Sequence, residues 1–117
     1  MCNVLIIDDD PDMLGLLKII LKPAGYKVEV SSPTEEIFHR VYNNRPDIVL
    51  LDVRMGDHDG RIICRDLKTK WGDELKVILF SARHDLRKSA LDCSADDFME
   101  KPFDIDQLIG KIKFHCN

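Results

Sequence analysis

The sequence predicts an α/β fold in which a parallel β-sheet lies between two layers of helices. Short, wholly apolar runs recur at 4–7, 48–51 and 77–80, and such runs are typical of strands buried on both faces. Segments with helical spacing of apolar residues alternate with them, and the connections are short. This alternation predicts a single domain that fills residues 1–117.

The first predicted strand covers residues 3–7 and ends at a run of aspartates. A helix over about 11–24 follows, because Asp10-Pro11 is a favourable helix start and leucines recur at helical spacing. Gly25 ends this helix as a C-cap residue. The alternating pattern of residues 27–30 then predicts an outer strand of the sheet.

The middle of the chain continues this alternation of helix and strand. A helix is predicted over 32–44, and the buried strand 48–52 follows it. This strand ends abruptly at Asp52, shortly before a turn-prone segment over 56–60. A further helix is predicted over about 60–70.

The last part of the chain contains two strands, at 77–80 and 97–100, each followed by a predicted helix. The helix over about 85–92 has few apolar residues, so we expect it to pack lightly and to be the most mobile element. The final helix, from about 105, carries a regular apolar face. The prediction is therefore five strands alternating with five helices.

Composition and charge exclude several classes of protein. Apolar residues make up 44% and charged residues 32% of the chain, as in a compact folded domain. The net charge is −4, from 17 basic and 21 acidic residues, which gives no electrostatic case for nucleic-acid binding. No apolar run is long enough to span a membrane, and aspartates interrupt the only early apolar run, so a signal peptide is not expected. We therefore predict a cytoplasmic protein without a membrane partner.

The four cysteines suggest neither a metal site nor a redox motif. They are Cys2, Cys64, Cys93 and Cys116, none of them in a CxxC pair or at metal-ligand spacing from a histidine. Their even number allows disulfides, but the predicted compartment favours reduced thiols.

Polar side chains follow four of the predicted strands at the point where each strand ends. They are Asp8 and Asp9, Asp52, Ser81, and Lys101. Because the carboxyl ends of parallel strands meet at one edge of a sheet, these side chains can converge. Clustered carboxylates repel unless a cation neutralises them, and Mg²⁺ prefers such oxygen ligands. With a lysine beside the metal, the set indicates a site for a phosphoryl group.

Each of these residues has an ordinary structural interpretation when it is taken alone. An aspartate after a strand is often a helix cap, Ser81 could be a loop hydroxyl, and Lys101 could be a surface lysine. Their joint arrival at the ends of neighbouring strands favours a functional site.

The chain resembles the receiver domain of two-component response regulators over essentially its whole length. The segments that carry the resemblance are 4–11, 50–55, Asp59-Gly60, 80–82 and 95–103. Their order and spacing are highly specific. The resemblance implies a flavodoxin-like (βα)5 three-layer sandwich, with a five-stranded parallel sheet in the order 2-1-3-4-5.

The resemblance also implies the chemistry of the site. Asp52 would be the phospho-acceptor that attacks a phosphohistidine and forms an aspartyl phosphate. Asp9, Asp52 and the backbone carbonyl of Arg54 would bind Mg²⁺ directly, and Asp8 would hold a metal-bound water. Catalysis would then consist of positioning and charge neutralisation, limited to the protein's own phosphorylation and dephosphorylation.

The phosphoryl oxygens would be bound by Lys101, the Ser81 hydroxyl and the Ala82 amide. Movement of Ser81 would leave space for an aromatic side chain, which by position is Phe98, and so switch the surface formed by the fourth helix, the fifth strand and the fifth helix. The alternative is that Phe98 is an ordinary core residue. The implied phosphodonor is a sensor histidine kinase or a phosphotransfer protein.

Several residues depart from the family pattern. Gly56 stands where proline is usual, so we expect a looser loop, and Asp57, His58, Ser94 and Phe98 also differ from the common residues. None of these changes removes a site residue.

Two arginines flank the path along which water would attack the phosphoryl group. Arg54 and Arg83 each lie two residues beyond a site residue, and our hypothesis is that they tune the phosphoryl lifetime. Solvated arginines at the rim of the site are the equally open alternative.

Three other functions fit the residues less well. A haloacid-dehalogenase-type phosphatase would carry an acid where this chain has Arg54, and a flavodoxin would carry a phosphate-cradling loop where this chain has three aspartates. A degenerate receiver would lack site residues that are present here.

No output domain follows residue 117, so the chain is either a stand-alone receiver or a fragment of a longer regulator or hybrid kinase. The downstream target and a homodimer on phosphorylation stay open.

Overall fold

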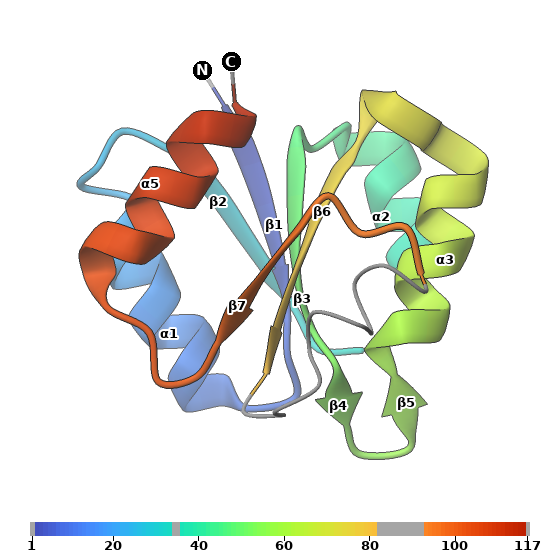
Figure 1. Cartoon of the computed structure of the whole chain (residues 1–117), viewed down its shortest axis with the longest axis horizontal. Helices are drawn as coiled ribbons and strands as arrows, with labels where there is room; N and C mark the ends of the chain where they lie inside the picture. The colour runs from blue at the N-terminus through green and yellow to red at the C-terminus, as the bar shows by residue number, and fades with distance from the viewer. Residues whose placement is uncertain (1, 34–35, 82–92, 117) are drawn as a thin grey trace.

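Parallel strands and flanking helices form three layers in the computed structural model, which describes residues 2–33, 36–81 and 93–116. The strands of the main sheet are β1 (Asn3–Ile7), β2 (Lys27–Ser31), β3 (Ile48–Asp52), β6 (Lys76–Ser81) and β7 (Asp97–Glu100). The helices are α1 (Pro11–Leu21), α2 (Ile37–Asn44), α3 (Gly60–Trp71) and α5 (Ile105–His115). Helices α1 and α5 cover one face of the sheet, and α2 and α3 cover the other (Figure 1).

The sheet order is β2-β1-β3-β6-β7, and every neighbouring pair is parallel. The predicted order 2-1-3-4-5 and the predicted fold class are therefore confirmed. Since all five strands run the same way, their carboxyl ends lie at the same edge of the sheet, at the bottom of Figure 1. The predicted helix over 85–92 lies outside the described residues.

The ends of two helices differ from the prediction. Helix α1 ends at Leu21 and not at residue 24, because Pro23 has no N–H to continue the hydrogen-bond ladder. Helix α2 starts at Ile37, later than predicted, with Glu36 at its N-cap.

Two short elements were not predicted from the sequence. Strands β4 (Arg54–Met55) and β5 (His58–Asp59) form a small antiparallel hairpin directly after β3. A 3₁₀ turn, η1 (Gly72–Glu74), follows α3. The hairpin lies at the carboxyl edge of the sheet, beside the predicted site (Figure 1).

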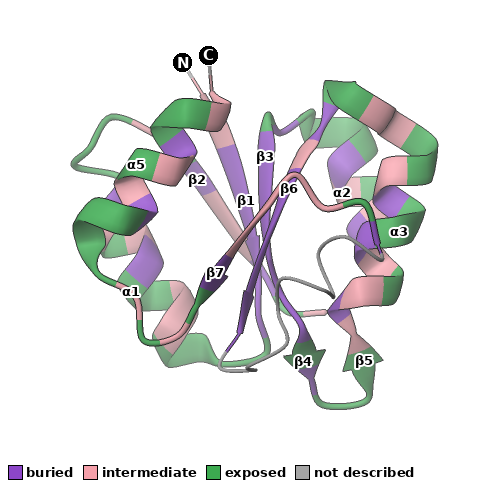
Figure 2. Cartoon of the chain, viewed as in Figure 1, coloured by how far each residue is buried: buried purple, intermediate pink, exposed green. Residues whose placement is uncertain are grey.

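The core lies on both faces of the sheet because the strand side chains alternate between them. Strand β3 is buried at all five positions, and β1, β3 and β6 are coloured as buried over nearly their whole length in Figure 2. Leu5, Val49 and Leu67 belong to the cluster under α2 and α3, whereas Ile6 and Phe80 belong to the cluster under α1 and α5. The central strands thus form a rigid support for the residues at their ends.

A largely buried ion pair fixes the opposite, amino edge of the sheet. The Lys68 ammonium donates to an Asp96 carboxylate oxygen at 2.8 Å and to the carbonyl oxygens of Gly72 at 2.8 Å and Leu75 at 2.9 Å. The same Asp96 oxygen accepts a hydrogen bond from the Val77 N–H at 2.8 Å. These extra hydrogen bonds help to compensate the buried charges of Lys68 and Asp96. The ion pair thus joins α3 to the starts of β6 and β7.

A disulfide joins Cys2, beside the start of β1, to Cys116, at the end of α5. The two Cα atoms are 5.9 Å apart, and Figure 1 shows the two ends of the chain side by side. The prediction of reduced thiols is therefore wrong for this pair. That prediction rested on the expected cellular compartment, whereas the fold brings these two cysteines within bonding distance. Cys64 and Cys93 are not in a disulfide. None of the helices in the described part of the chain is both long and apolar enough to cross a bilayer.

Replacing Cys2 and Cys116 by Ser together is expected to lower the free energy of unfolding by about 2–4 kcal/mol, because the bond restricts the unfolded chain across a sequence separation of 114. Urea titration with and without a reductant measures this difference. The Cys2→Ser/Cys116→Ser protein should not respond to the reductant. A wild-type midpoint that is unchanged by reduction would contradict the expectation.

Candidate functional site

Three carboxylates meet at the carboxyl edge of the sheet. Asp8 and Asp9 follow β1, Asp52 ends β3, and the two strands are neighbours with Ile7 paired to Leu51. One carboxylate oxygen of each aspartate lies within 4.8 Å of the others. Asp8 and Asp52 are 1% and 7% exposed, whereas Asp9 is exposed. The grouping of these three residues agrees with the prediction from the strand ends.

The Lys101 ammonium compensates the two buried acids. Its Nζ lies 3.4 Å from a carboxylate oxygen of Asp8 and 3.4 Å from one of Asp52. The Lys101 backbone N–H donates to the Ser81 carbonyl at 2.9 Å, which fixes the end of β7 against the end of β6. The ammonium also lies 4.7 Å from the centre of the Phe80 ring, within cation–π range.

Burial raises the pKa of Asp52 to about 6. The Lys101 ammonium works against this rise, and the Asp8 carboxylate adds to it. A divalent cation beside the three carboxylates would favour the ionised form further, because a bound ion is the largest local charge in such a site. The donor set fits a hard cation, since all three side chains offer carboxylate oxygens.

The backbone after Asp52 is held by a close approach of α3. Gly60 donates to the Val53 carbonyl at 2.8 Å, and the Arg54 N–H donates to an Asp52 carboxylate oxygen at 3.4 Å. A β-carbon on Gly60 would collide with the Asp52 carbonyl oxygen and lie 2.9 Å from its carbon. Glycine at this position therefore allows α3 to begin directly against the end of β3.

The loop that starts with Gly56 is the β4–β5 hairpin. Gly56 has a φ of +59° between the two strands, and a β-carbon there would lie 3.9 Å from an Asp9 carboxylate oxygen. Arg54 pairs with Asp59 and Met55 with His58. The substitution of glycine for the usual proline thus supplies the positive φ that this turn needs, and the looseness of the loop stays a prediction.

The remaining predicted site residues lie on or beside β6 and β7. Ser81 is buried at the end of β6, next to β3. Phe98 is half-buried and packs against the core cluster under α2 and α3, with the Lys111 ammonium 5.9 Å from the centre of its ring. Ala82 and Arg83 lie outside the described residues. The position of Phe98 is compatible with both interpretations made from the sequence.

An ionic group between β7 and α5 was not found from the sequence. Lys111 Nζ and His115 Nε2 each lie 2.9 Å from a different carboxylate oxygen of Asp97. Burial works to raise the pKa of Asp97, but hydrogen bonds from Lys111 and His115 outweigh it and hold this pKa below its ordinary value. The spacing of four residues between Lys111 and His115 was the available signal, since it places both on one helix face.

Hollows lie on either side of the acidic cluster. One of about 380 Å³, largely apolar, is lined by Met13, Leu16, Lys101, Pro102 and Phe103. Another of about 300 Å³ lies over the β4–β5 hairpin. Both hollows adjoin the site. Because Lys101 and the α1 residues Met13 and Leu16 line the apolar hollow, that hollow gives an approach to Lys101 from the side of α1.

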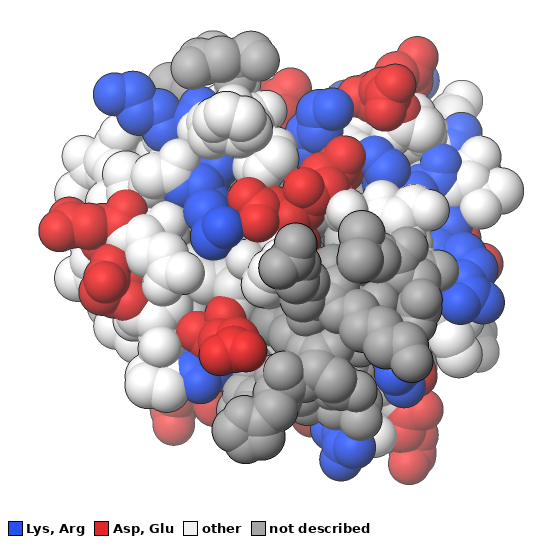
Figure 3. Space-filling view, viewed as in Figure 1, with Lys and Arg blue, Asp and Glu red and all other residues white. Residues whose placement is uncertain are grey.

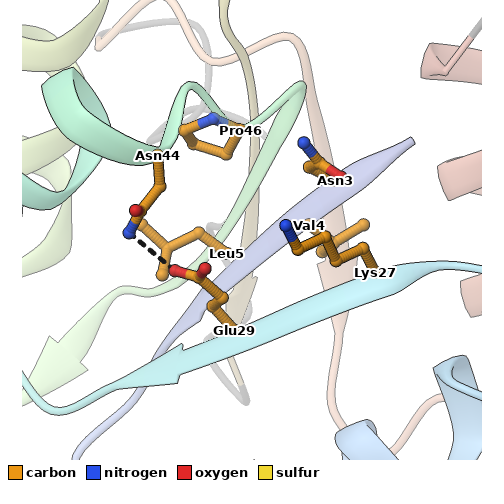
Figure 4. Close-up of a pocket in the computed structure, with 7 residues that line it drawn as sticks. All are labelled: Asn3, Val4, Leu5, Lys27, Glu29, Asn44 and Pro46. Carbon is orange, nitrogen blue, oxygen red and sulfur yellow. Dashed lines mark hydrogen bonds between the residues drawn. The ribbon is translucent and has the colours of Figure 1, made fainter. Parts of the chain in front are cut away.

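A third cavity lies between β1, β2 and the end of α2 (Figure 4). Asn44 donates to Glu29 across it at 2.7 Å. Its volume of about 10 Å³ holds a single water molecule and no organic ligand. On the described part of the face in Figure 3, lysines and arginines alternate with acidic side chains.

Replacing Gly60 by Ala is expected to lower the free energy of unfolding by about 1–3 kcal/mol, because the new methyl group collides with backbone atoms of Asp52 and Val53. Gly110→Ala on α5 is the matched control. It meets no atom within 4 Å and should stabilise the helix by up to about 1 kcal/mol. Urea titration of both variants measures the two changes in the free energy of unfolding. Equal changes in the two variants would contradict the close approach of Gly60 to the Asp52 backbone.

Comparison with known proteins places this arrangement among signalling domains. The family model described as the response regulator receiver domain matches residues 4–113. Response regulator MprA of Mycobacterium sp. (strain KMS) is 37% identical over 113 residues, which are 95% of this chain and 49% of that protein. MprA of Mycobacterium leprae is 36% identical over the same shares. The chain thus spans about half the length of these relatives.

Solved structures agree with this result. Response regulator TrrA from Thermotoga maritima, in complex with Mg²⁺ and a beryllium fluoride, is 30% identical with a TM-score of 0.89, over 98% of this chain and 99% of that chain. The BeF3-activated receiver domain of Klebsiella pneumoniae RstA has the same TM-score at 24% identity, over 98% of each chain. At 24% identity, the similarity to RstA shows the fold alone.

Proposed function

Because the chain belongs to the response regulator receiver domain family, we propose that it accepts a phosphoryl group on Asp52 from a sensor histidine kinase or a phosphotransfer protein. The observation that carries this proposal is the Lys101 ammonium between two buried acids at the carboxyl edge of the sheet. This arrangement leaves the negative charge of Asp52 partly compensated. It also holds the Asp52 carboxylate at the end of a rigid strand, where it can reach an incoming phosphoryl group.

The cation that this site would hold is Mg²⁺, with Asp9, Asp52 and the Arg54 carbonyl as direct ligands and Asp8 as the residue that orients a metal-bound water. When bound, the ion neutralises charge on the transferred group. Asp52 supplies the attacking carboxylate oxygen, and the bond from phosphorus to the donor nitrogen breaks as the new bond to oxygen forms. Lys101, the Ser81 hydroxyl and the Ala82 amide would hold the three phosphoryl oxygens.

The protein would act on itself and have no separate substrate. The residue two positions beyond Asp52 is Arg54, which cannot serve as the second acid of a phosphatase. The phosphoryl group would stay until water removes it, so its lifetime sets the duration of the signal. The output would be a change at the surface formed by the segment before β7, β7 itself and α5, driven by Ser81 and Phe98.

The phosphodonor would bind on the side of α1. The hollow lined by Met13, Leu16 and Phe103 is the apolar surface that adjoins Lys101, and a donor seated there would hold its phosphohistidine near Asp52. We propose that this phosphoryl transfer takes place in the cytoplasm. We propose no direct contact with nucleic acid or membrane for this domain, and a homodimer on phosphorylation is one way to deliver its output.

Incubation with Mg²⁺ and acetyl phosphate is expected to add one phosphoryl group to the wild-type protein and none to Asp52→Ala. Intact-mass measurement detects the adduct. Asp66→Asn is the control, because it removes an exposed carboxylate on α3 and should leave the adduct unchanged.

Beryllofluoride binding in the presence of Mg²⁺, followed by the tryptophan fluorescence of Trp71, gives a second readout that needs no phosphodonor. A folded wild-type protein that neither forms the adduct nor binds beryllofluoride would overturn the proposal.

Replacing Arg54 by Ala is expected to speed the loss of the phosphoryl group about two- to fivefold, the range for one exposed charge near the reacting group. The exposed Arg54 follows Asp52 closely and would hinder the approach of water. Decay of the isolated phosphoprotein measures the rate. Lys27→Ala, at the amino edge of the sheet, is the control. Equal decay of wild type, Arg54→Ala and Arg83→Ala would leave both arginines without this role.

A further inference from the structure

Two of the four cysteines remain as thiols and lie against each other in the core. Cys64 is on the first turns of α3, and Cys93 precedes the backbone that leads into β7. Both are 0% exposed. The Cys64 thiol donates to the Cys93 carbonyl oxygen at 3.4 Å, and both side chains belong to the hydrophobic cluster under α2 and α3. Two cysteines that are 29 residues apart in the sequence are therefore direct neighbours in the core.

The contact makes the two thiols unequal. The hydrogen bond from Cys64 lowers the pKa of Cys93, although burial works in the opposite direction, and the same hydrogen bond raises the pKa of Cys64. Cys93 is thus the better nucleophile, and Cys64 is the thiol that keeps its proton. This is the division of roles found between an attacking and a resolving cysteine.

We propose that Cys64 and Cys93 form a redox modification site, which a hydroperoxide converts to an intramolecular disulfide that opposes activation of the receiver.

The chemistry balances with the hydroperoxide as the oxidant. The Cys93 thiolate attacks the outer peroxide oxygen, the O–O bond breaks, an alcohol leaves and Cys93 becomes a sulfenic acid. The proton lost from Cys93 ends on the departing alcohol, which is water when the oxidant is hydrogen peroxide. The Cys64 sulfur then attacks the Cys93 sulfur, and the sulfenic hydroxyl takes up the Cys64 proton and leaves as water. Two thiols are oxidised by two electrons, and one hydroperoxide is reduced.

The position of the pair explains why the cross-link would matter. Cys64 and Cys93 belong to the hydrophobic cluster against which Phe98 packs, and Ser94 follows Cys93 with a φ of +64°. Closing the sulfur atoms to a bond of about 2.05 Å would fix the segment before β7 to α3. Helix α3 starts at Gly60 against the Asp52 backbone, so one bond would connect the acceptor side of the site to the strand that carries Phe98. This second part of the proposal rests on the proposed function.

The first experiment tests disulfide formation alone. Wild-type protein and Cys2→Ser/Cys116→Ser are treated with hydrogen peroxide, blocked with iodoacetamide under denaturing conditions, and digested without reductant. We expect a cross-linked peptide pair containing Cys64 and Cys93, formed slowly because both thiols are buried and oxidation needs local opening. The wild type serves if the double variant is unstable, since its other two cysteines are already paired.

Single variants separate the proposed roles of the two thiols. In Cys64→Ala, Cys93 should be oxidised to sulfenic acid and trapped by dimedone, with no cross-linked peptide. This oxidation should be slower than cross-linking in the wild type, because the hydrogen bond that lowers the pKa of Cys93 is lost. In Cys93→Ala, Cys64 should resist oxidation. Recovery of both cysteines as alkylated thiols in the wild type, or their further oxidation without a cross-link, overturns the site.

The second experiment tests the effect on activation. The affinity for beryllofluoride with Mg²⁺ is compared before and after oxidation, and we expect it to fall about fivefold or more and to recover on reduction. If oxidation leaves the affinity for beryllofluoride unchanged, the proposed coupling between the disulfide and activation is overturned. Failure of the reduced protein to bind beryllofluoride would instead count against the proposed function, while the peptide result would still decide the disulfide.

Discussion

The contact of the Lys101 ammonium with Asp8 and Asp52 is the interaction on which the site depends. Three carboxylates at one sheet edge repel each other, and two of them are buried. The lysine can reach both because β7 pairs with β6, and the Lys101 N–H bonds to the Ser81 carbonyl. The fold thus brings a positive charge from the last strand to acids carried by the first and third strands.

This balance leaves Asp52 in an intermediate electrostatic state. Burial raises the pKa of Asp52, and Lys101 opposes that effect without abolishing it. The ionised form of a carboxylate in such a setting is stabilised by every further positive charge, so the proposed cation binding and phosphoryl transfer would be favoured by the same local field. Rigid support from β3 and from Gly60 keeps the carboxylate in place while these charges change.

The sequence was most informative where one physical rule decides the structure. The apolar runs that end in Asp8, Asp52 and Ser81 predicted both the buried strands and the convergence of their ends, because parallel strands share one edge. The early end of α1 depends on Pro23, which ends the hydrogen-bond ladder before the apolar spacing ends at residue 24. The bond between Cys2 and Cys116 and the pair of Lys68 with Asp96 depend on which segments become neighbours in three dimensions, and no local pattern encodes that.

The Cys2–Cys116 bond changes how the domain responds to mechanical force. It joins the beginning of β1 to the end of α5, so the covalent structure between these residues is a closed ring. Tension applied between the two ends passes directly through the sulfur atoms and does not load the hydrogen bonds of the sheet. Pulling would therefore leave the acidic cluster and Lys101 undisturbed as long as the ring is closed, whereas reduction would transmit the same force to the strands that carry them.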